Sequence, residues 1–176
     1  PAVLELGGSD PSIVLADADL DKATDVLTLS RIINAGQSCI AAKRIIVEEN
    51  VYDKVEALMK EKLAALKLGD PREADTDVGP IARPDLRDEL HRQVQETIKQ
   101  GADCVLGGKL PSGDGYFYPV TLLTNVTPDM CAFNEETFGP VGVLVKARDA
   151  DHAVELANDT RYGLAASIWT ETSRGE

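Results

Sequence analysis

Hydrophobic positions along the chain form short apolar runs, separated by longer stretches in which apolar residues recur at helical spacing. Most of the runs are enclosed by glycine, proline or aspartate, which is typical of strands bounded by turns. The expected strands occupy residues 2–6, 12–15, 44–48, 104–106, 117–123, 141–146 and 165–170.

The longer stretches predict helices between these strands. Asp19 and Asn50 each precede such a stretch and can cap a helix N-terminus. Pro84 suits the first turn of another helix, and Gly101 ends it. The expected helices occupy residues 20–34, 50–68, 84–100 and 149–157.

Strands that alternate with helices of this length imply right-handed crossover connections. We therefore predict an α/β fold of three layers, with helices on both faces of a largely parallel sheet, whose ligands bind near the carboxyl ends of the strands. No internal repeat or low-complexity tract divides the chain, so residues 1–176 are expected to form one domain. Because the chain starts at Pro1 and not at Met, we expect it to be excised from something longer.

Composition narrows the classes of function. With 18 Lys+Arg and 30 Asp+Glu the formal charge is −12, which disfavours nucleic acid and anionic membranes as partners. No apolar run approaches the length of a membrane-spanning helix, and no export signal is present. The 3 cysteines have no C-x-x-C spacing, which argues against a disulfide framework or a zinc site. We expect a cytoplasmic protein without nucleic acid, membrane or metal partners.

The sequence lacks the motifs for phosphate binding and offers no support for metal or histidine chemistry. The chain has no G-x-G-x-x-G and no P-loop, so it offers no phosphate cradle of its own. His91 and His152 are expected on solvated helix faces with no ligand cluster nearby, which disfavours metal or His-assisted chemistry.

Cys39 and Glu5 are the candidate reactive residues. Cys39 follows Gly36, which interrupts a helical stretch, so its thiol could project into a cleft from a turn or helix start. Composition alone favours the other interpretation, a small buried core residue, which is also the one given to Cys104 and Cys131. Glu5 is a carboxylate within an apolar strand, where it could be a general base or an outward-facing residue of the alternation. The residues alone leave both alternatives open.

Four motifs follow one another along the chain. They are Leu4-Glu5-Leu6-Gly7-Gly8, Gly36-Gln37-x-Cys39, Glu136-Thr137-Phe138-Gly139-Pro140 and Asn158-Asp159-Thr160-x-Tyr162-Gly163-Leu164-Ala165-Ala166. In this order they resemble the aldehyde dehydrogenase superfamily, specifically its catalytic domain. The intervals between Glu5, Cys39 and Glu136 are those of that family, and the resemblance covers essentially the whole chain.

The resemblance implies an enzyme with a covalent mechanism. Cys39 would attack the aldehyde carbon, and Glu5 would activate the water that hydrolyses the resulting thioester. Glu136 would bind the nicotinamide ribose hydroxyls and Phe138 would pack at the nicotinamide end of NAD or NADP, with the cofactor held mainly by a domain absent from this chain. That domain would also supply an Asn to the oxyanion. The parent protein is expected to be a homodimer or homotetramer.

The resemblance also bears on the substrate. Retention of Glu5 favours hydrolysis to a free carboxylic acid over transfer to coenzyme A. Several stretches look most like bacterial succinate-semialdehyde dehydrogenases, which makes succinate semialdehyde a candidate substrate. Ile33, however, stands where such enzymes have an arginine, and an aliphatic side chain cannot hold a carboxylate. The identity of the aldehyde therefore stays open.

Two other functions remain as alternatives. Without a cofactor domain, this polypeptide alone could be an inactive folded module with an interaction face and exposed apolar surface. A thiol redox protein that uses Cys39 is a more distant alternative, because no resolving cysteine lies close in sequence.

Overall fold

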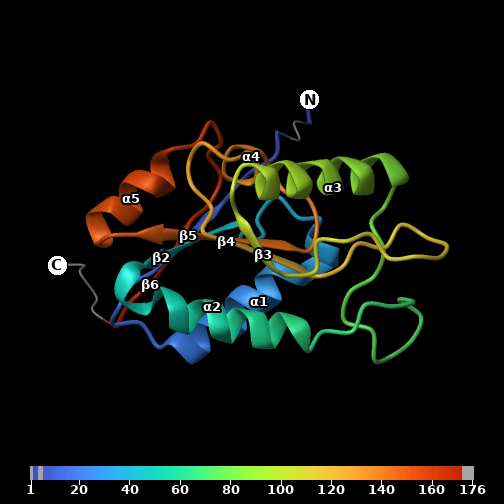
Figure 1. Ribbon diagram of the computed structural model, residues 1–176, viewed down its shortest axis with the longest axis horizontal. Coiled ribbons are helices and arrows are strands. Elements are labelled where there is room, and N and C mark those ends of the chain that lie inside the picture. Colours follow the sequence, from blue (N-terminus) through green and yellow to red (C-terminus); the bar gives the residue numbers. More distant parts are fainter. Residues whose placement is uncertain (1, 4–5, 172–176) are drawn as a thin grey trace.

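The computed structural model describes residues 2–3 and 6–171 and forms three layers around a central sheet (Figure 1). Helices α1 and α2 cover one face of the sheet, and α3, α4 and α5 cover the other. In order, the described elements are β1 (Pro11–Val14), α1 (Leu20–Ile32), the 3-10 helix η1 (Ile33–Gly36), β2 (Arg44–Glu48), α2 (Glu49–Ala64), α3 (Pro84–Lys99), β3 (Asp103–Leu106), β4 (Thr121–Thr124), α4 (Cys131–Asn134), β5 (Val141–Ala147), α5 (Ala150–Asn158) and β6 (Ser167–Trp169).

The sheet confirms the predicted fold class. In the described part of the chain the strand order is β3-β4-β5-β2-β1-β6. Only the pairing of β3 with β4 is antiparallel in this sheet, and the other neighbours are parallel. The parallel strands are joined through helices, as crossover connections require.

Two apolar cores lie on the two faces of the sheet because successive strand residues point to opposite sides. On β2, Ile46 packs into the core under α3, α4 and α5, whereas Ile45 and Val47 pack into the core over α1 and α2. On β5, Val143 and Leu144 divide in the same way. Burial on both faces explains why these strands are continuous apolar runs in the sequence.

The predicted cap at Asp19 is confirmed, and Asp149, where the helix over 149–157 was expected to start, is also a cap. Asp19 Oδ1 accepts the backbone N–H of Lys22 at 3.1 Å, and Asp149 Oδ1 accepts that of His152 at 2.8 Å. The prediction of Asn50 as a cap is wrong, because β2 runs directly into α2 and Asn50 lies inside its first turn. The helix also ends at Ala64, well before Gly69.

Other boundaries differ from the pattern. Ala2, Val3 and Leu6 carry no strand, and the remaining two positions of that predicted strand lie outside the described residues. β4 begins at Thr121, after Pro119, which has no N–H to donate to a neighbouring strand. The short helix α4 has too few residues for a helical period to show in the sequence.

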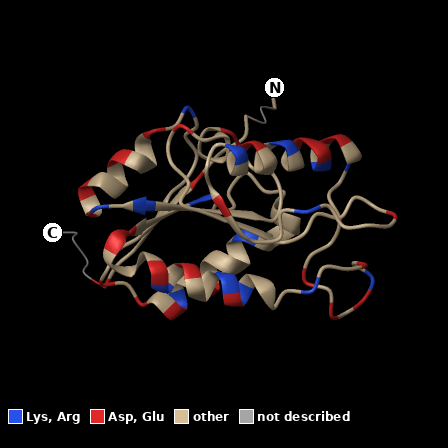
Figure 2. Cartoon of the chain, viewed as in Figure 1, with Lys and Arg blue, Asp and Glu red and all other residues tan. Residues whose placement is uncertain are grey.

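Charged residues of both signs are interspersed along the helices, most clearly on α3 (Figure 2). Within the described ranges, no helix is both long and apolar enough to cross a bilayer. Among the same residues, no group of three or more His, Cys, Asp or Glu side chains is arranged to hold a metal ion.

Candidate active site

Cys39 lies on a turn between η1 and β2, half-buried, so its thiol is not part of the core. The chain leaves the helix because Asn34 and Ala35 adopt φ values of 52° and 55°, and Gly36 follows at 74°. These left-handed conformations end the helical hydrogen bonding. The turn, and not a helix start, therefore presents Cys39.

Gly36 brings the turn against the Glu136 motif. A Cβ atom at this glycine would overlap the carbonyl group of Gly139. Side chains on the turn close it further: Asn34 Nδ2 donates to the Gln37 carbonyl at 3.0 Å, and Gln37 Nε2 donates to the Asn34 carbonyl at 3.1 Å. Only glycine allows both this φ value and this close approach.

The Gly-Gly motif lies on the other side of the turn. A Cβ at Gly7 would overlap the carboxylate of Glu136, and one at Gly8 would lie 3.0 Å from the Cys39 carbonyl oxygen and 3.2 Å from Leu164 Cδ2. Residues of all four sequence motifs therefore meet around the Cys39 turn. Sequence order alone could not establish this convergence.

Of the other three predicted site residues, the structure describes Glu136 and Phe138 but not Glu5. Glu136 and Phe138 are half-buried. Glu136 Oε1 lies 3.4 Å from Lys43 Nζ and accepts no hydrogen bond from the described residues, although it is buried. A buried carboxylate oxygen without a donor fits a ribose hydroxyl, so the residues present fit the nicotinamide cofactor that the family resemblance implies.

Two buried cations at the turn were missed by the sequence reasoning. Arg31 donates to the Gly36 carbonyl at 2.8 Å and to the Ala42 carbonyl at 3.2 Å, so it spans the turn. Its burial lowers its pKa to about 10, and the charge of Glu136 opposes that shift. Lys43 Nζ donates to the carbonyls of Ser38 and Cys39, both at 2.8 Å. The only signal in the sequence was the adjacent pair Lys43-Arg44 before an apolar run, and nothing in the sequence pointed to Arg31.

The neighbouring acid, Glu135, has a structural role. Its carboxylate accepts hydrogen bonds from Arg92 at 2.7 Å and from Gln93 at 3.1 Å. Burial alone would raise the pKa of Glu135, but the hydrogen bonds from Gln93 and Arg92 lower it below its usual value. Gln93 also donates to the Glu136 carbonyl at 3.1 Å, which ties this segment to α3.

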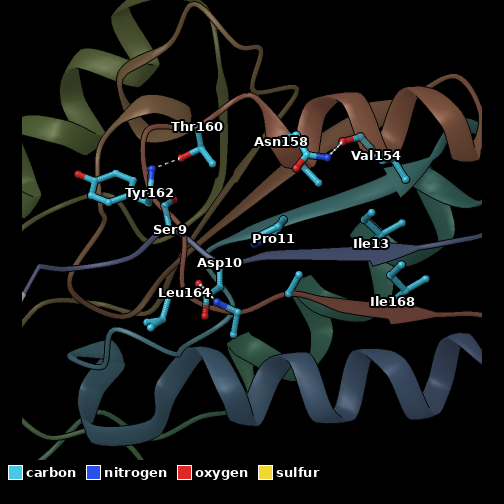
Figure 3. Close-up of a pocket in the computed structure, with 14 residues that line it drawn as sticks. Ser9, Asp10, Pro11, Ile13, Val154, Asn158, Thr160, Tyr162, Leu164 and Ile168 are labelled. Atoms are coloured by element: carbon cyan, nitrogen blue, oxygen red, sulfur yellow. Dashed lines mark hydrogen bonds between the residues drawn. The ribbon is translucent and has the colours of Figure 1, made fainter.

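A cavity of ≈ 440 Å³ lies beside this site, between β1, β6 and α5. Figure 3 shows Asp10 and Leu164 together at one end of it, away from Ile13 and Ile168. Asp10 Oδ1 accepts the Ala165 N–H at 3.1 Å. Neither Cys39 nor Glu136 lines this cavity, so it is distinct from the Cys39 turn.

The histidines are less exposed than the sequence suggested. His91 is half-buried, with Nδ1 3.3 Å from the Tyr118 hydroxyl, and His152 Nδ1 accepts the Arg148 N–H at 3.1 Å. Cys131 is buried as expected, whereas Cys104 is only half-buried.

With this geometry in place, comparison with known proteins defines the class. The model of the aldehyde dehydrogenase family matches residues 1–175, and the chain belongs to that family. It is 54% identical over 168 residues to succinate semialdehyde dehydrogenase [NAD(P)+] Sad of Escherichia coli (strain K12), covering 96% of this chain and 36% of that protein. It is 49% identical over 170 residues to succinate-semialdehyde dehydrogenase [NADP(+)] of Mycobacterium avium (strain 104), covering 97% of this chain and 36% of that protein.

A solved structure supports the same family assignment. The crystal structure of lactaldehyde dehydrogenase from Escherichia coli superposes with a TM-score of 0.94 at 39% identity, covering 96% of this chain and 36% of that chain. The chain therefore spans about a third of the length of the relatives it matches.

Proposed function

We propose that residues 1–176 are the catalytic domain of an NAD(P)+-dependent aldehyde dehydrogenase that oxidises an aldehyde to its carboxylic acid. The observation that carries this proposal is the convergence of the Cys39 turn, the Gly7-Gly8 segment and Glu136 at one place. The names of the relatives, which include both NAD(P)+ and NADP(+), support the cofactor class.

Cys39 is the proposed nucleophile. The thiol gives up its proton to solvent, an electron pair of the sulfur forms a bond to the aldehyde carbon, and the carbonyl π pair moves to oxygen, which gives the anion of a thiohemiacetal. The backbone N–H of Cys39, on a turn held at several carbonyl groups, would stabilise the developing oxyanion together with an Asn from outside this chain.

Glu136 and Phe138 are the proposed cofactor contacts of this chain. The free oxygen of Glu136 would accept from the ribose hydroxyls, and Phe138 would pack at the nicotinamide end. When bound there, NAD(P)+ would supply the acceptor for the hydride that leaves the former aldehyde carbon, so that the adduct on Cys39 becomes a thioester. Glu5 would then take a proton from the water that attacks the thioester, which releases the acid and restores the thiol of Cys39.

Succinate semialdehyde is the first substrate to test, because relatives that share about half of the residues carry its name. Ile33 is 52% exposed and offers no hydrogen bond to a carboxylate. We therefore propose that groups outside this chain bind the substrate carboxylate.

A kinetic assay tests the function. The complete natural protein is mixed with NAD+ or NADP+ and either succinate semialdehyde or butanal, an uncharged aldehyde of equal carbon number, and reduced cofactor is followed by absorbance. We expect turnover that depends on the aldehyde. Failure of every aldehyde tested to support cofactor reduction would overturn the proposal.

The alternative, an inactive module, is favoured by exposed apolar side chains near the turn. Val26 and Leu29 are exposed on α1, Ile33 is exposed at the start of η1, and Ile40 next to Cys39 is 66% exposed. Such a surface suits contact with a cofactor domain or a second subunit of a homodimer or homotetramer. The same assay on the 176-residue chain alone separates the two: this alternative predicts no turnover, and measurable turnover excludes it.

We also propose that the protein acts in the cytoplasm. The three cysteines are free, as suits a reducing compartment.

A further inference from the structure

Lys43 has no role in the chemistry proposed above, yet it lies at the centre of the site. Its side chain is 1% exposed, which is unusual for lysine. Nζ donates at 2.8 Å to the carbonyl of Ser38 and at 2.8 Å to that of Cys39. An ammonium group has three protons, so these two hydrogen bonds leave one proton for another acceptor.

The carboxylate of Glu136 lies close to this ammonium group and carries the opposite charge. Nζ and Glu136 Oε1 are 3.4 Å apart, and the carboxylate side chain is 18% exposed. Glu136 Oε1 accepts no hydrogen bond from the described residues, and it is stabilised by the adjacent charge of Lys43 and by the charge of Arg31. In a partly dry site, an opposite charge at this distance attracts much more strongly than it would in water.

Burying the charged ammonium group of Lys43 is unfavourable, and its contacts with carbonyl groups and with Glu136 must offset this cost. Burial lowers the pKa of Lys43, the nearby charge of Arg31 lowers it further, and the charge of Glu136 opposes both. Removing the carboxylate would leave the buried ammonium with two carbonyls and only the charge of Asp10 to oppose its burial, and removing the ammonium would leave the carboxylate with only the charge of Arg31. Lys43 Nζ therefore links the Cys39 turn to the carboxylate of Glu136.

We propose that Lys43 is a positioning residue that couples the Cys39 turn to the cofactor-binding carboxylate of Glu136. The proposal rests on the proposed function insofar as Glu136 binds the cofactor. Through its two carbonyl contacts Lys43 holds the main chain that carries the nucleophile, and through its charge it fixes Glu136 next to Gly7. If ribose binding shifts Glu136, Lys43 would move with it and would displace the main chain of the Cys39 turn.

The test uses the complete protein with Lys43→Met, which keeps the length of the side chain and removes its charge and donors. We expect amides of residues 38–41 to exchange with deuterium faster, and the Kd for NADH or NADPH, from fluorescence titration, to rise by ~10-fold. In a Glu136→Gln background the same substitution should change the Kd less than twofold, because Lys43 acts on the cofactor through Glu136.

Two further variants keep the result interpretable. Lys62→Met is the control, since Lys62 also donates to a carbonyl, that of Asp21, and pairs with Asp25, but does so at the other end of α1. It should leave both readouts unchanged. If Lys43→Met does not fold, Lys43→Gln replaces it: this side chain keeps a donor for the turn but not the charge, so the Kd should rise while exchange at residues 38–41 changes less.

Either of two results would overturn the proposal: wild-type exchange and Kd in both Lys43 variants, or an equal rise in Kd with and without the carboxylate of Glu136. Failure of the proposed function is recognised separately. A wild-type protein that binds no nicotinamide cofactor and oxidises no aldehyde contradicts that function, and exchange at the turn still reports whether Lys43 holds it.

Discussion

Cys39→Ala in the complete protein is expected to abolish aldehyde oxidation, with a loss in kcat of at least ~1,000-fold. The half-buried thiol lies on a turn held by Arg31 and Lys43, and alanine removes the sulfur while leaving those carbonyl contacts in place. The loss should therefore appear in kcat, whereas the Kd for reduced cofactor should change little. Steady-state assays and cofactor titration measure the two effects.

Cys104→Ala is the matched control for this substitution. Cys104 is also a free, half-buried cysteine, but its thiol donates to the Leu106 carbonyl at 3.3 Å on β3, the edge strand farthest along the sheet from β6. It should keep wild-type kinetics. Activity retained in Cys39→Ala, or lost equally in both variants, would contradict the role proposed for Cys39.

The largest effect on stability is expected at Arg44. This buried guanidinium donates to the carbonyls of Leu156 and Ala157, both at 2.9 Å, and to that of Ser9 at 3.1 Å, and it lies 4.9 Å from the centre of the Phe133 ring. The first two carbonyls belong to the last turn of α5, where a helix has a partial negative charge. Arg44 therefore joins β2 to α5 and to Ser9, which directly follows the Gly7-Gly8 motif.

Arg44→Met should lower the free energy of unfolding by ~3–5 kcal/mol, because three carbonyl acceptors, in two buried hydrogen bonds and one part-buried one, lose a charged donor. Urea unfolding of the 176-residue chain, followed by the fluorescence of its single tryptophan, measures the change. Arg72→Met is the control: Arg72 pairs with Asp70 on the surface, where such a pair contributes little. Similar destabilisation by the two substitutions would show that the carbonyl contacts of Arg44 do not stabilise the fold as argued.

The fold could be predicted from sequence wherever burial produced a pattern. β2 and β5 are apolar on both faces, and α3 carries Leu90 and Val94 on one buried face, so their periods are clear. The start of β4 and the helix α4 could not be predicted, since Pro119 and a single helical turn leave no period.

The candidate site residues were predicted from family motifs and not from the pattern of burial. Cys39, Glu5, Glu136 and Phe138 came from resemblance to a family, because each residue type alone had an ordinary structural explanation. The buried cations Arg31, Lys43 and Arg44 could not be predicted, since their partners are mostly main-chain carbonyls, which every residue carries. Which carbonyls they reach depends on tertiary structure.

The central claim is that Cys39 forms the covalent intermediate, and trapping that intermediate tests it most directly. Glu5→Gln removes the proposed base for hydrolysis, so the thioester should accumulate when the complete protein is mixed with oxidised cofactor and succinate semialdehyde or another aldehyde that it oxidises. Mass spectrometry of the digested protein should then find the acyl group on the peptide that contains Cys39. An acyl group on a different residue, or turnover by the wild type with no acylation of Cys39 in the trapped variant, would contradict the account.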